Sequence, residues 1–435
     1  MNARESAFLS LQKYENSGVY SNIELSYAIE RGGLEGAEKA LYTALFYGVI
    51  ERKMTLDYYI AELSDREDID LNVRIMLRIG LYQLIYMTKI PESAAVNEAV
   101  VLTKKYNRNP KASSLVNGVL RNAVRSKGQL KEPVSYADKY SHPEELISLL
   151  KANLPKGKLE SMLIANNASP QTVVQVNTLK ITPATLMVRL EKEHVTAHPH
   201  GWMPDCLILG GTGNLESLPS FKEGLFYVQD PAAKLSVLCA RLPQADIRLL
   251  DCCSAPGGKS FAAAIAMEGK GQIISCDIHA HKTGLIANGA DRLGLTNITA
   301  RQQDATENVA DWVGAMDVVI ADVPCSGLGI IRKKPDIRYK NLAEMKELPA
   351  LQLAILRNQA TYVKPGGVLI YSTCTVLKQE NEDVVSDFLK DNDDFYLEPL
   401  ELPEVFPKNE TGMLTLIPGE YDTDGFFISR LRRKA

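Results

Sequence analysis

The sequence predicts a multidomain protein with an all-α N-terminal domain, a small α/β module and a C-terminal Rossmann-like α/β domain. Two observations carry this prediction. Residues 1–127 hold apolar residues at helical spacing without the alternation of a strand. Residues 221–435 hold short apolar runs that end at turn residues, which is typical of an open α/β sheet. The length of 435 residues suits two or three domains.

The N-terminal domain is predicted to be helical from two stretches. The first comprises Leu71, Ile75, Ile79, Tyr82 and Tyr86. The second comprises Ala95, Ala99 and Leu102 and follows Pro91, a residue that suits the first turn of a helix. A polar linker over 128–143 separates this domain from the small module over 144–220. Within the module we expect helices near 144–153 and 183–193 and a strand over 172–177.

The C-terminal domain contains a strand that ends near Asp251, a tight turn over Ala255–Gly258 and a helix over 261–266. Glycines at such a turn let the backbone approach a ligand closely. The turn is not a Walker A loop, because position 253 is cysteine where the first glycine would stand. It also lacks the first and last glycines of a dinucleotide fingerprint. We therefore expect a nucleoside ligand that is held without a phosphate clamp.

Four successive predicted strands end at an aspartate, namely Asp251, Asp277, Asp304 and Asp322. A single such residue is usually a cap or a turn residue. Asp277, however, follows the glycine turn by roughly 20 residues, the place at which ribose hydroxyls are bound in related folds. The set indicates a nucleoside pocket, and S-adenosylmethionine fits it, since that cofactor has ribose, adenine and an amino-acid tail but no phosphate.

Two cysteines follow apolar runs in the same domain. Cys325 comes after the run over 318–321, and Cys374 comes after the run over 368–371. Because ligands of an open α/β sheet bind at the carboxyl ends of its strands, both thiols are expected at the working edge. The alternative is that they are small buried hydrophobes, as free cysteines often are.

Three motifs, at 251–260, 322–327 and 372–374, resemble those of the RsmB/NOP family of RNA cytosine-5 methyltransferases. The resemblance covers about 220–433 and implies that a thiolate attacks C6 of cytosine so that C5 accepts a methyl group. It gives Cys374 as the nucleophile, Cys325 as the helper in release and Asp322 as a group that binds the cytosine edge. The residues alone leave open which thiol attacks. The implied cofactor residues are Cys253, Ser254, Ala255, Pro256, Gly257, Gly258, Lys259, Asp277, Asp304 and Asp322.

Residues 77–84, 95–100 and 116–121 resemble the NusB-like RNA-binding domain. The order of NusB-like domain, small module and methyltransferase domain is that of the bacterial RsmB/Sun/Fmu type. It implies methylation of C5 of one cytosine, number 967, in 16S ribosomal RNA, either free or in an early small-subunit particle. Two alternatives stay open: a transfer RNA cytosine-5 methyltransferase, and a non-catalytic RNA-binding or antitermination-type factor. Both cysteines and all four aspartates are present, which argues against the second alternative.

The charge is unevenly distributed, although the net charge is −4. No acid lies between 99 and 131, and a second basic stretch over 332–340 includes Arg338. Basic patches supply sequence-independent affinity for phosphate, whereas the commoner fate of a charge run is a solvated helix face. The RNA-binding candidates are Lys104, Lys105, Arg121, Arg125, Arg332, Lys333 and Lys334.

The remaining composition favours a cytoplasmic protein, and we expect a monomer, although the sequence does not determine the oligomeric state. The seven cysteines show no regular framework, and the N-terminus shows no charged-then-apolar leader. No run of about 18 apolar residues is present, so we expect no membrane partner. The cysteines also lack metal-ligand spacing, and we expect reduced thiols and no metal.

Overall fold

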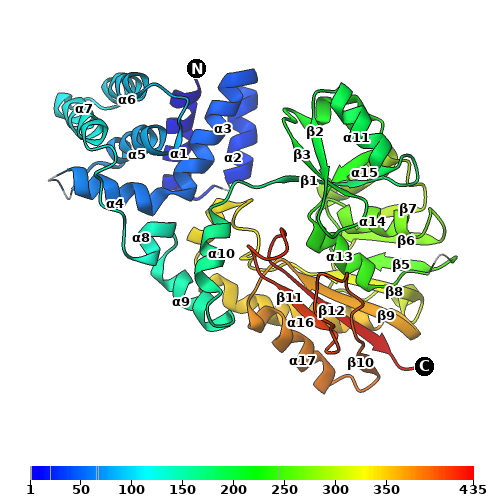
Figure 1. Ribbon diagram of the computed structural model, residues 1–435. Helices are drawn as coiled ribbons and strands as arrows, with labels where there is room; N and C mark the ends of the chain where they lie inside the picture. The colour runs from blue at the N-terminus through cyan, green and yellow to red at the C-terminus, as the bar shows by residue number, and fades with distance from the viewer. Residues whose placement is uncertain (1, 20, 65, 67, 244) are drawn as a thin grey trace. The chain divides into compact units, whose positions relative to one another are not determined.

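The computed structural model describes residues 2–19, 21–64, 66, 68–243 and 245–435, and the chain divides into two compact units. The first unit comprises Met1–Ala152, Lys156–Ala168 and Ile331–Lys340, and the second comprises Asn153–Pro155, Ser169–Ile330 and Asn341–Ala435. The first unit is helical, and the second contains two sheets (Figure 1). Among the described residues, no helix has the length and apolar character that a membrane span requires.

Helices α1 to α7 of the first unit pack around one apolar core. The helices are α1 (Ala3–Ser17), α2 (Ser21–Gly32), α3 (Gly36–Glu51), α4 (Lys53–Leu63), α5 (Leu71–Tyr86), α6 (Glu92–Tyr106), α7 (Pro110–Arg125), α8 (Tyr136–Tyr140), α9 (Glu144–Asn153) and α10 (Leu159–Asn166). Helix α5 begins where the Asp70 carboxylate accepts from Asn72 N–H at 3.0 Å, as a helix N-cap does. Ile75 and Leu77 of α5 are fully buried together with Leu120 of α7. The two helices that the apolar spacing predicted are α5 and α6.

The segment Ile331–Lys340 belongs to this helical unit although it follows the Pro-Cys motif in the chain. It forms the short helix η3 (Pro335–Tyr339). Arg338 is 1% exposed, and its Nη1 donates to Glu51 O and to Asn167 Oδ1, both at 2.8 Å. The prediction of RNA contact for the stretch 332–340 is therefore wrong at Arg338, because all three nitrogens of its guanidinium donate to oxygens inside the unit.

The second unit contains a four-stranded antiparallel sheet in the order β2-β3-β1-β4. Its strands are β1 (Thr172–Val176), β2 (Thr196–Pro199), β3 (Cys206–Gly210) and β4 (Phe226–Val228). The helices α11 (Pro183–Lys192) and α12 (Pro219–Lys222) and the turn η1 (Leu215–Ser217) accompany it. The sequence placed the end of this module at residue 220. The sheet extends further, because β4 at Phe226–Val228 pairs with β1. Helices α9 and α10 of the expected module group instead with the first unit, apart from Asn153 at the end of α9.

The larger sheet has the order β10-β12-β9-β8-β5-β6-β7, with β11 paired to β12. Its strands are β5 (Arg248–Asp251), β6 (Gln272–Asp277), β7 (Ile298–Gln302), β8 (Met316–Asp322), β9 (Val363–Thr373), β10 (Phe395–Leu397), β11 (Met413–Leu416) and β12 (Phe426–Arg433). The five strands from β9 to β7 are parallel, and β12 runs antiparallel to β9. The chain order reverses between β5 and β8, and ligands bind at such a switch point.

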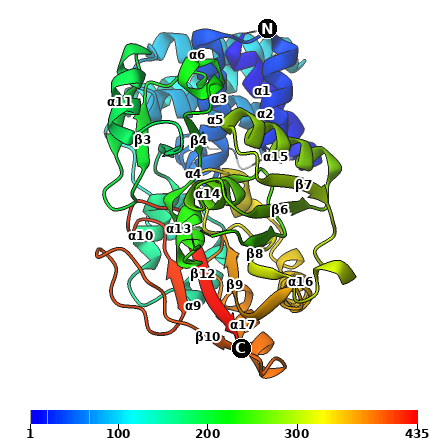
Figure 2. The same ribbon diagram turned by 90° about the vertical axis from the view of Figure 1, so that its right-hand side faces the viewer.

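Helices cover both faces of this sheet (Figure 2). Leu249 packs with α13 (Pro231–Cys239), α14 (Gly258–Ala266) and α15 (Ala280–Leu293). Leu250, the next residue of β5, packs on the other face with α16 (Leu348–Ala360) and α17 (Glu382–Lys390). Successive side chains of a strand point to opposite faces, so a continuous apolar run is required. The short helices η2 (Ala310–Trp312), η4 (Glu344–Glu347) and η5 (Lys378–Glu380) lie in the connections.

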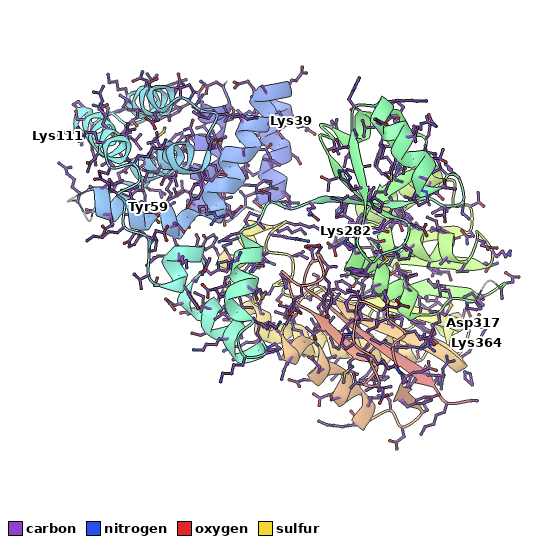
Figure 3. All side chains as sticks on the ribbon, viewed as in Figure 1. Lys39, Tyr59, Lys111, Lys282, Asp317 and Lys364 are labelled. Carbon is purple, nitrogen blue, oxygen red and sulfur yellow. The ribbon has the colours of Figure 1, made fainter. Side chains whose placement is uncertain are left out.

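The amino ends of β8 and β9 are held by charge. Lys364 Nζ donates to both Asp317 oxygens, at 2.8 and 2.9 Å (Figure 3). Asp317 Oδ2 also accepts from Arg248 N–H at 2.9 Å. Asp317 is therefore a structural acid at the amino ends of these strands.

Candidate active site

The loop between β5 and α14 is fixed by a buried network of hydroxyls. Asp251 is fully buried, and its Oδ2 accepts from Ser260 Oγ at 2.7 Å. Ser260 Oγ lies 3.0 Å from Ser254 Oγ and 2.7 Å from Ser275 Oγ. Burial raises the pKa of Asp251 to about 6. Asp251 does not line the cavity described below, so this strand-end acid holds the loop in place and is not a ligand contact.

The turn requires glycine at position 257. Its φ is 110°, a conformation that residues with a side chain rarely adopt. A Cβ atom there would also lie 2.4 Å from the Phe261 ring. The turn therefore delivers the start of α14 close to the sheet edge without a side chain in the way.

A cavity of about 460 Å³ opens at the carboxyl ends of the central strands. The predicted residues that line it are Cys253, Ala255, Asp277, Asp304, Asp322, Cys325 and Cys374. The predicted residues that do not line it are Ser254, Pro256, Gly257, Gly258 and Lys259. The lining residues that the sequence analysis missed are Cys252, Ile278, His279, Lys282, Gln303, Ala305, Thr306, Val323, Pro324, Leu351 and Ile355. Several of these residues are close neighbours in sequence of Asp277, Asp304 or Asp322, and this proximity could have predicted them.

Asp277 and Asp304 have local partners that orient their carboxylates. Asp277 Oδ1 accepts from His279 N–H at 3.0 Å, and Lys282 Nζ lies 3.8 Å from the same oxygen. Asp304 Oδ1 accepts from Thr306 N–H at 2.8 Å and from its hydroxyl at 2.7 Å. The hydrogen bonds from Thr306 lower the pKa of Asp304. Both acids therefore present fixed acceptors to the cavity.

Asp322 is held by a lysine from the first turn of α14. Lys259 Nζ lies 2.6 Å from Asp322 Oδ2, and Ser372 Oγ donates to Asp322 Oδ1 at 2.7 Å. Burial lowers the pKa of Lys259, but Asp322, Asp251 and Cys374 outweigh burial and raise that pKa overall. Lys259 is therefore an ammonium that lies in the electrostatic field of both Asp322 and Cys374.

The two thiols that the motifs singled out meet at the sheet edge. Cys325 Sγ lies 3.0 Å from Cys374 Sγ, and it accepts from Cys374 N–H at 3.2 Å. Both are half-buried, whereas Cys206, Cys239 and Cys276 are buried. A hydrogen bond with Cys374, burial and the charges of Cys374 and Glu380 raise the pKa of the Cys325 thiol. This pair is accessible from the cavity, so it is not the inert core feature that the alternative interpretation required.

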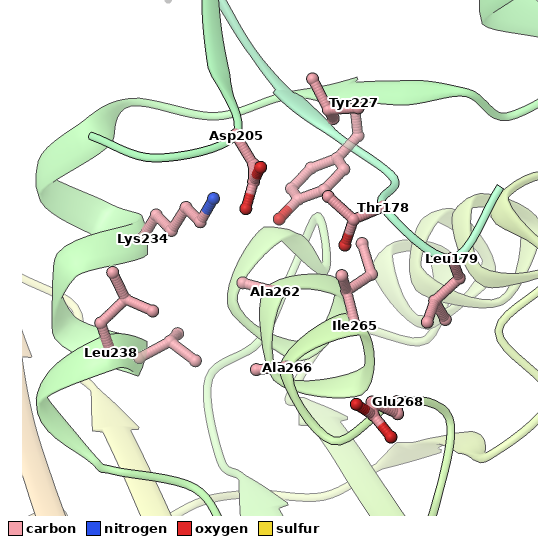
Figure 4. A pocket seen from close by; sticks show the side chains of 12 residues that line it. Thr178, Leu179, Asp205, Tyr227, Lys234, Leu238, Ala262, Ile265, Ala266 and Glu268 are labelled. Atoms are coloured by element: carbon pink, nitrogen blue, oxygen red, sulfur yellow. The ribbon is translucent and has the colours of Figure 1, made fainter. Parts of the chain in front are cut away.

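A second, larger cavity of about 610 Å³ lies elsewhere in the unit (Figure 4). Ala262, Ile265 and Ala266 line it from the far part of α14, with Lys234 of α13 and Tyr227 of β4. None of the predicted site residues lines it. The smaller cavity is therefore the candidate active site, despite its size. In the described part of the chain, no group of three or more His, Cys, Asp or Glu is placed to hold a metal ion.

The basic candidates differ in their surroundings. Lys104, Lys105, Arg121 and Arg125 are exposed in the helical unit. Lys105 forms an ion pair with Glu5, and Arg121 Nε donates to Asn117 Oδ1 at 2.9 Å. Arg332 and Lys333 are half-buried, and Lys334 is exposed. Nothing in these positions tests RNA contact, which stays a prediction for all seven residues.

Three family models match the chain. They are the NusB family over 1–125, the ferredoxin-like domain of RsmF/B-like methyltransferases over 142–216, and the 16S rRNA methyltransferase RsmB/F over 239–432. The predicted fold class, with a NusB-like helical domain and an α/β methyltransferase domain, is confirmed by these matches.

Individual proteins match over the whole length. The chain is 36% identical to the "probable ribosomal RNA small subunit methyltransferase B" of Synechocystis sp., covering 100% of both chains. It is also 36% identical to the protein of the same name from Bacillus subtilis, covering 99% of this chain and 98% of that one. The crystal structure of PH0851 matches with a TM-score of 0.80 at 24% identity, covering 99% of this chain and 98% of that chain, which shows a shared fold.

Proposed function

Because the chain belongs to the RsmB/F family of 16S rRNA methyltransferases, which use S-adenosylmethionine, we propose that it methylates C5 of one cytosine of 16S rRNA through a covalent cysteine intermediate. The resemblance to the RsmB/Sun/Fmu type supports the cytosine numbered 967 as the target. The observation that carries this proposal is a pair of thiols 3.0 Å apart in the cavity that Asp277 and Asp304 also line.

The cavity suits S-adenosylmethionine in size and chemistry. Its volume of about 460 Å³ lies within the roughly 300–1,000 Å³ of small-molecule sites. Ile278 is 51% exposed there and offers an apolar surface for adenine, next to the Asp277 carboxylate as an acceptor for ribose hydroxyls. The bound cofactor supplies an electrophilic methyl group on a sulfonium. The predicted cofactor residues that do not line the cavity contribute to binding indirectly, because Ser254 and the glycine turn hold the loop between β5 and α14 in shape.

A covalent mechanism answers the weak nucleophilicity of cytosine C5. A thiolate adds to C6, and the ring electrons move so that C5 can form a bond to the methyl carbon. A base then removes the C5 proton, the C5–C6 double bond returns and the C6–S bond breaks. The Asp322 carboxylate binds the N3/N4 edge of the base and favours a protonated ring during attack. The base must leave its stack to reach the strand-end thiols.

The charges around the pair favour Cys374 as the nucleophile. Lys259 lies in the field of Cys374, whereas Cys325 lies in the field of Glu380 and has a raised pKa. Cys325 therefore holds its proton more tightly than an ordinary thiol, which suits the helper, and the cation acts on Cys374, the residue that the family motifs give as the nucleophile.

Cys325 becomes a base only after the attack. The largest cause of its raised pKa is the hydrogen bond with Cys374. Once the Cys374 sulfur is bonded to C6, it no longer shares that hydrogen bond as a thiolate, and Cys325 gives its proton to water. The Cys325 thiolate then takes the C5 proton, and Cys374 leaves as a thiolate. Each residue ends in its starting protonation state.

The RNA is held in part by basic residues of both stretches. Lys104, Lys105, Arg121 and Arg125 dock the RNA through phosphate contacts, as do Arg332, Lys333 and Lys334. A transfer RNA substrate or a non-catalytic binding role are the competing functions. The experiment is transfer of a labelled methyl group to purified 16S rRNA and to transfer RNA, followed by bisulfite sequencing. Methylation of transfer RNA alone, or of neither RNA in free or particle form, would contradict the proposal.

A further inference from the structure

A buried carboxylate lies directly behind the thiol pair. Glu380 ends the helix η5 and is 0% exposed. Its Oε2 accepts from Ser326 N–H and from the Gln352 side-chain amide, both at 2.9 Å. Its Oε1 has no hydrogen-bond partner among the described residues. A charged group is costly to bury, and a half-satisfied one requires a reason for its presence.

This carboxylate joins the two loops that carry the thiols. It lies six positions after Cys374, and it binds the residue that follows Cys325. The Gln352 amide that donates to Glu380 also donates to Pro324 O at 3.0 Å, on the other side of Cys325. Glu380 thus fixes the backbone on both sides of the Cys325 thiol and ties it to the Cys374 loop.

A second set of bonds brings the same loops together without charge. Ser326 Oγ donates to Thr375 Oγ1 at 2.8 Å, and Gly329 N–H donates to Cys374 O at 2.9 Å. The two loops are therefore already joined by neutral hydrogen bonds that do not involve Glu380. The carboxylate adds what they do not provide, which is a negative charge on the Cys325 side of the pair.

The titratable groups around the pair are divided by sign. Lys259 from α14 and Asp322 from β8 form an ion pair on the cavity side, and Lys259 interacts with Cys374. Glu380 from η5 interacts with Cys325, as does the phenol of Tyr371 from β9. The Tyr371 hydroxyl itself donates to Glu380 O at 2.5 Å. A cation therefore acts on one sulfur and a carboxylate on the other.

We propose that Glu380 is a positioning residue that holds Cys325 beside Cys374 and keeps Cys325 protonated until Cys374 has bonded to the base. This role rests on the proposed covalent mechanism. Glu380 does not line the candidate active-site cavity. It acts through the Cys325 loop.

The test compares Glu380→Gln, Glu380→Ala and the control Glu382→Gln. Glutamine keeps an oxygen that accepts from Ser326 and Gln352 but removes the charge. Glu382 lies two residues away, and its Oε1 accepts from Thr415 Oγ1 at 2.9 Å, so its replacement removes the same charge outside the thiol loops. Each full-length variant is first checked for S-adenosylmethionine binding by calorimetry, which reports an intact fold.

The main measurement is the rate of alkylation of each cysteine by iodoacetamide across pH, resolved by peptide mass spectrometry. In Glu380→Gln the Cys325 profile should move to lower pH, and below its midpoint the rate should rise roughly tenfold for each unit that the pKa falls. Glu380→Ala should in addition accumulate a covalent complex with unmodified RNA, because a displaced Cys325 cannot remove the C5 proton. Glu382→Gln should match the wild type in both measurements.

The role is refuted if the Cys325 alkylation rate depends on pH in the same way in Glu380→Gln as in the Glu382→Gln control. It is also refuted if folded Glu380→Ala releases RNA at the wild-type rate. Failure of the covalent mechanism itself has a separate signature: wild-type protein would form no adduct with RNA that carries 5-fluorocytosine at the target. The alkylation profiles do not depend on that result.

Discussion

Replacing Asp277 tests whether the acid that ends β6 holds the cofactor. Asp277 lines the cavity, and its Oδ1 is oriented by His279 N–H. A hydrogen bond to a charged group contributes about 1.5–3 kcal/mol. Asp277→Ala should therefore weaken S-adenosylmethionine binding by roughly 10- to 150-fold. Asp277→Asn should weaken it less, because the amide oxygen still accepts from His279 N–H and from a ribose hydroxyl.

Titration calorimetry on the full-length protein measures this affinity directly. The matched control is Asp291→Asn, which removes the same charge from an exposed position on α15. Wild-type affinity in Asp277→Ala would remove Asp277 from the site. An equal loss in Asp291→Asn would mean that net charge, and not a ribose contact, determines the binding.

Four further predictions follow from the same geometry. Cys374→Ala should abolish methyl transfer and the adduct with 5-fluorocytosine RNA while calorimetry shows cofactor binding nearly intact; a persisting adduct would assign the nucleophile elsewhere. Cys325→Ala should still attack but release slowly, so a denaturing gel should show trapped RNA, and normal turnover without it would make Cys325 a packing residue. Replacing Arg121 and Arg125 with Ala should weaken RNA binding and flatten its salt slope by about two units, one for each lost phosphate contact; an unchanged slope in a titration over several salt concentrations would contradict docking on this face. Folding raises the pKa of Asp251 from 3.8 to about 6, so the folded state binds this proton more tightly than the unfolded state does. As pH rises from about 4 to 7, the wild type should therefore lose about 3 kcal/mol of folding stability relative to Asp251→Asn, which cannot ionise. Urea unfolding curves whose difference stays constant over that range would refute this.

The sequence by itself determined the position of the site along the chain. Apolar runs of strand length and the residues that end them are local features, and parallel strands bring their carboxyl ends to one edge. That rule was enough to bring Asp277, Asp304 and Asp322 to one cavity with Cys325 and Cys374. The family motifs then gave the cofactor, which the match to the methyltransferase family supports.

The same local rule did not distinguish roles at that edge. Asp251 follows a strand as Asp277 does, yet it is fully buried on Ser260 and does not reach the cavity. Lys259 was predicted as a cofactor residue, but its ammonium pairs with Asp322, which lies 63 positions further along the chain. Asp251 and Asp277 both end strands, yet one anchors a loop and the other lines the cavity, because burial and the nearest partner decide what a carboxylate does.

The tertiary structure alone decided the contacts between distant segments. Arg338 looked like part of a solvated basic stretch, but in the helical unit it satisfies backbone carbonyls from Glu51 and Asn166. The 3.0 Å approach of Cys325 to Cys374, and the carboxylate of Glu380 behind them, join positions about 50 apart in the chain. Local pattern carries no information on such pairs, since hydrogen bonds and ion pairs form between whichever groups the fold leaves unsatisfied in its interior.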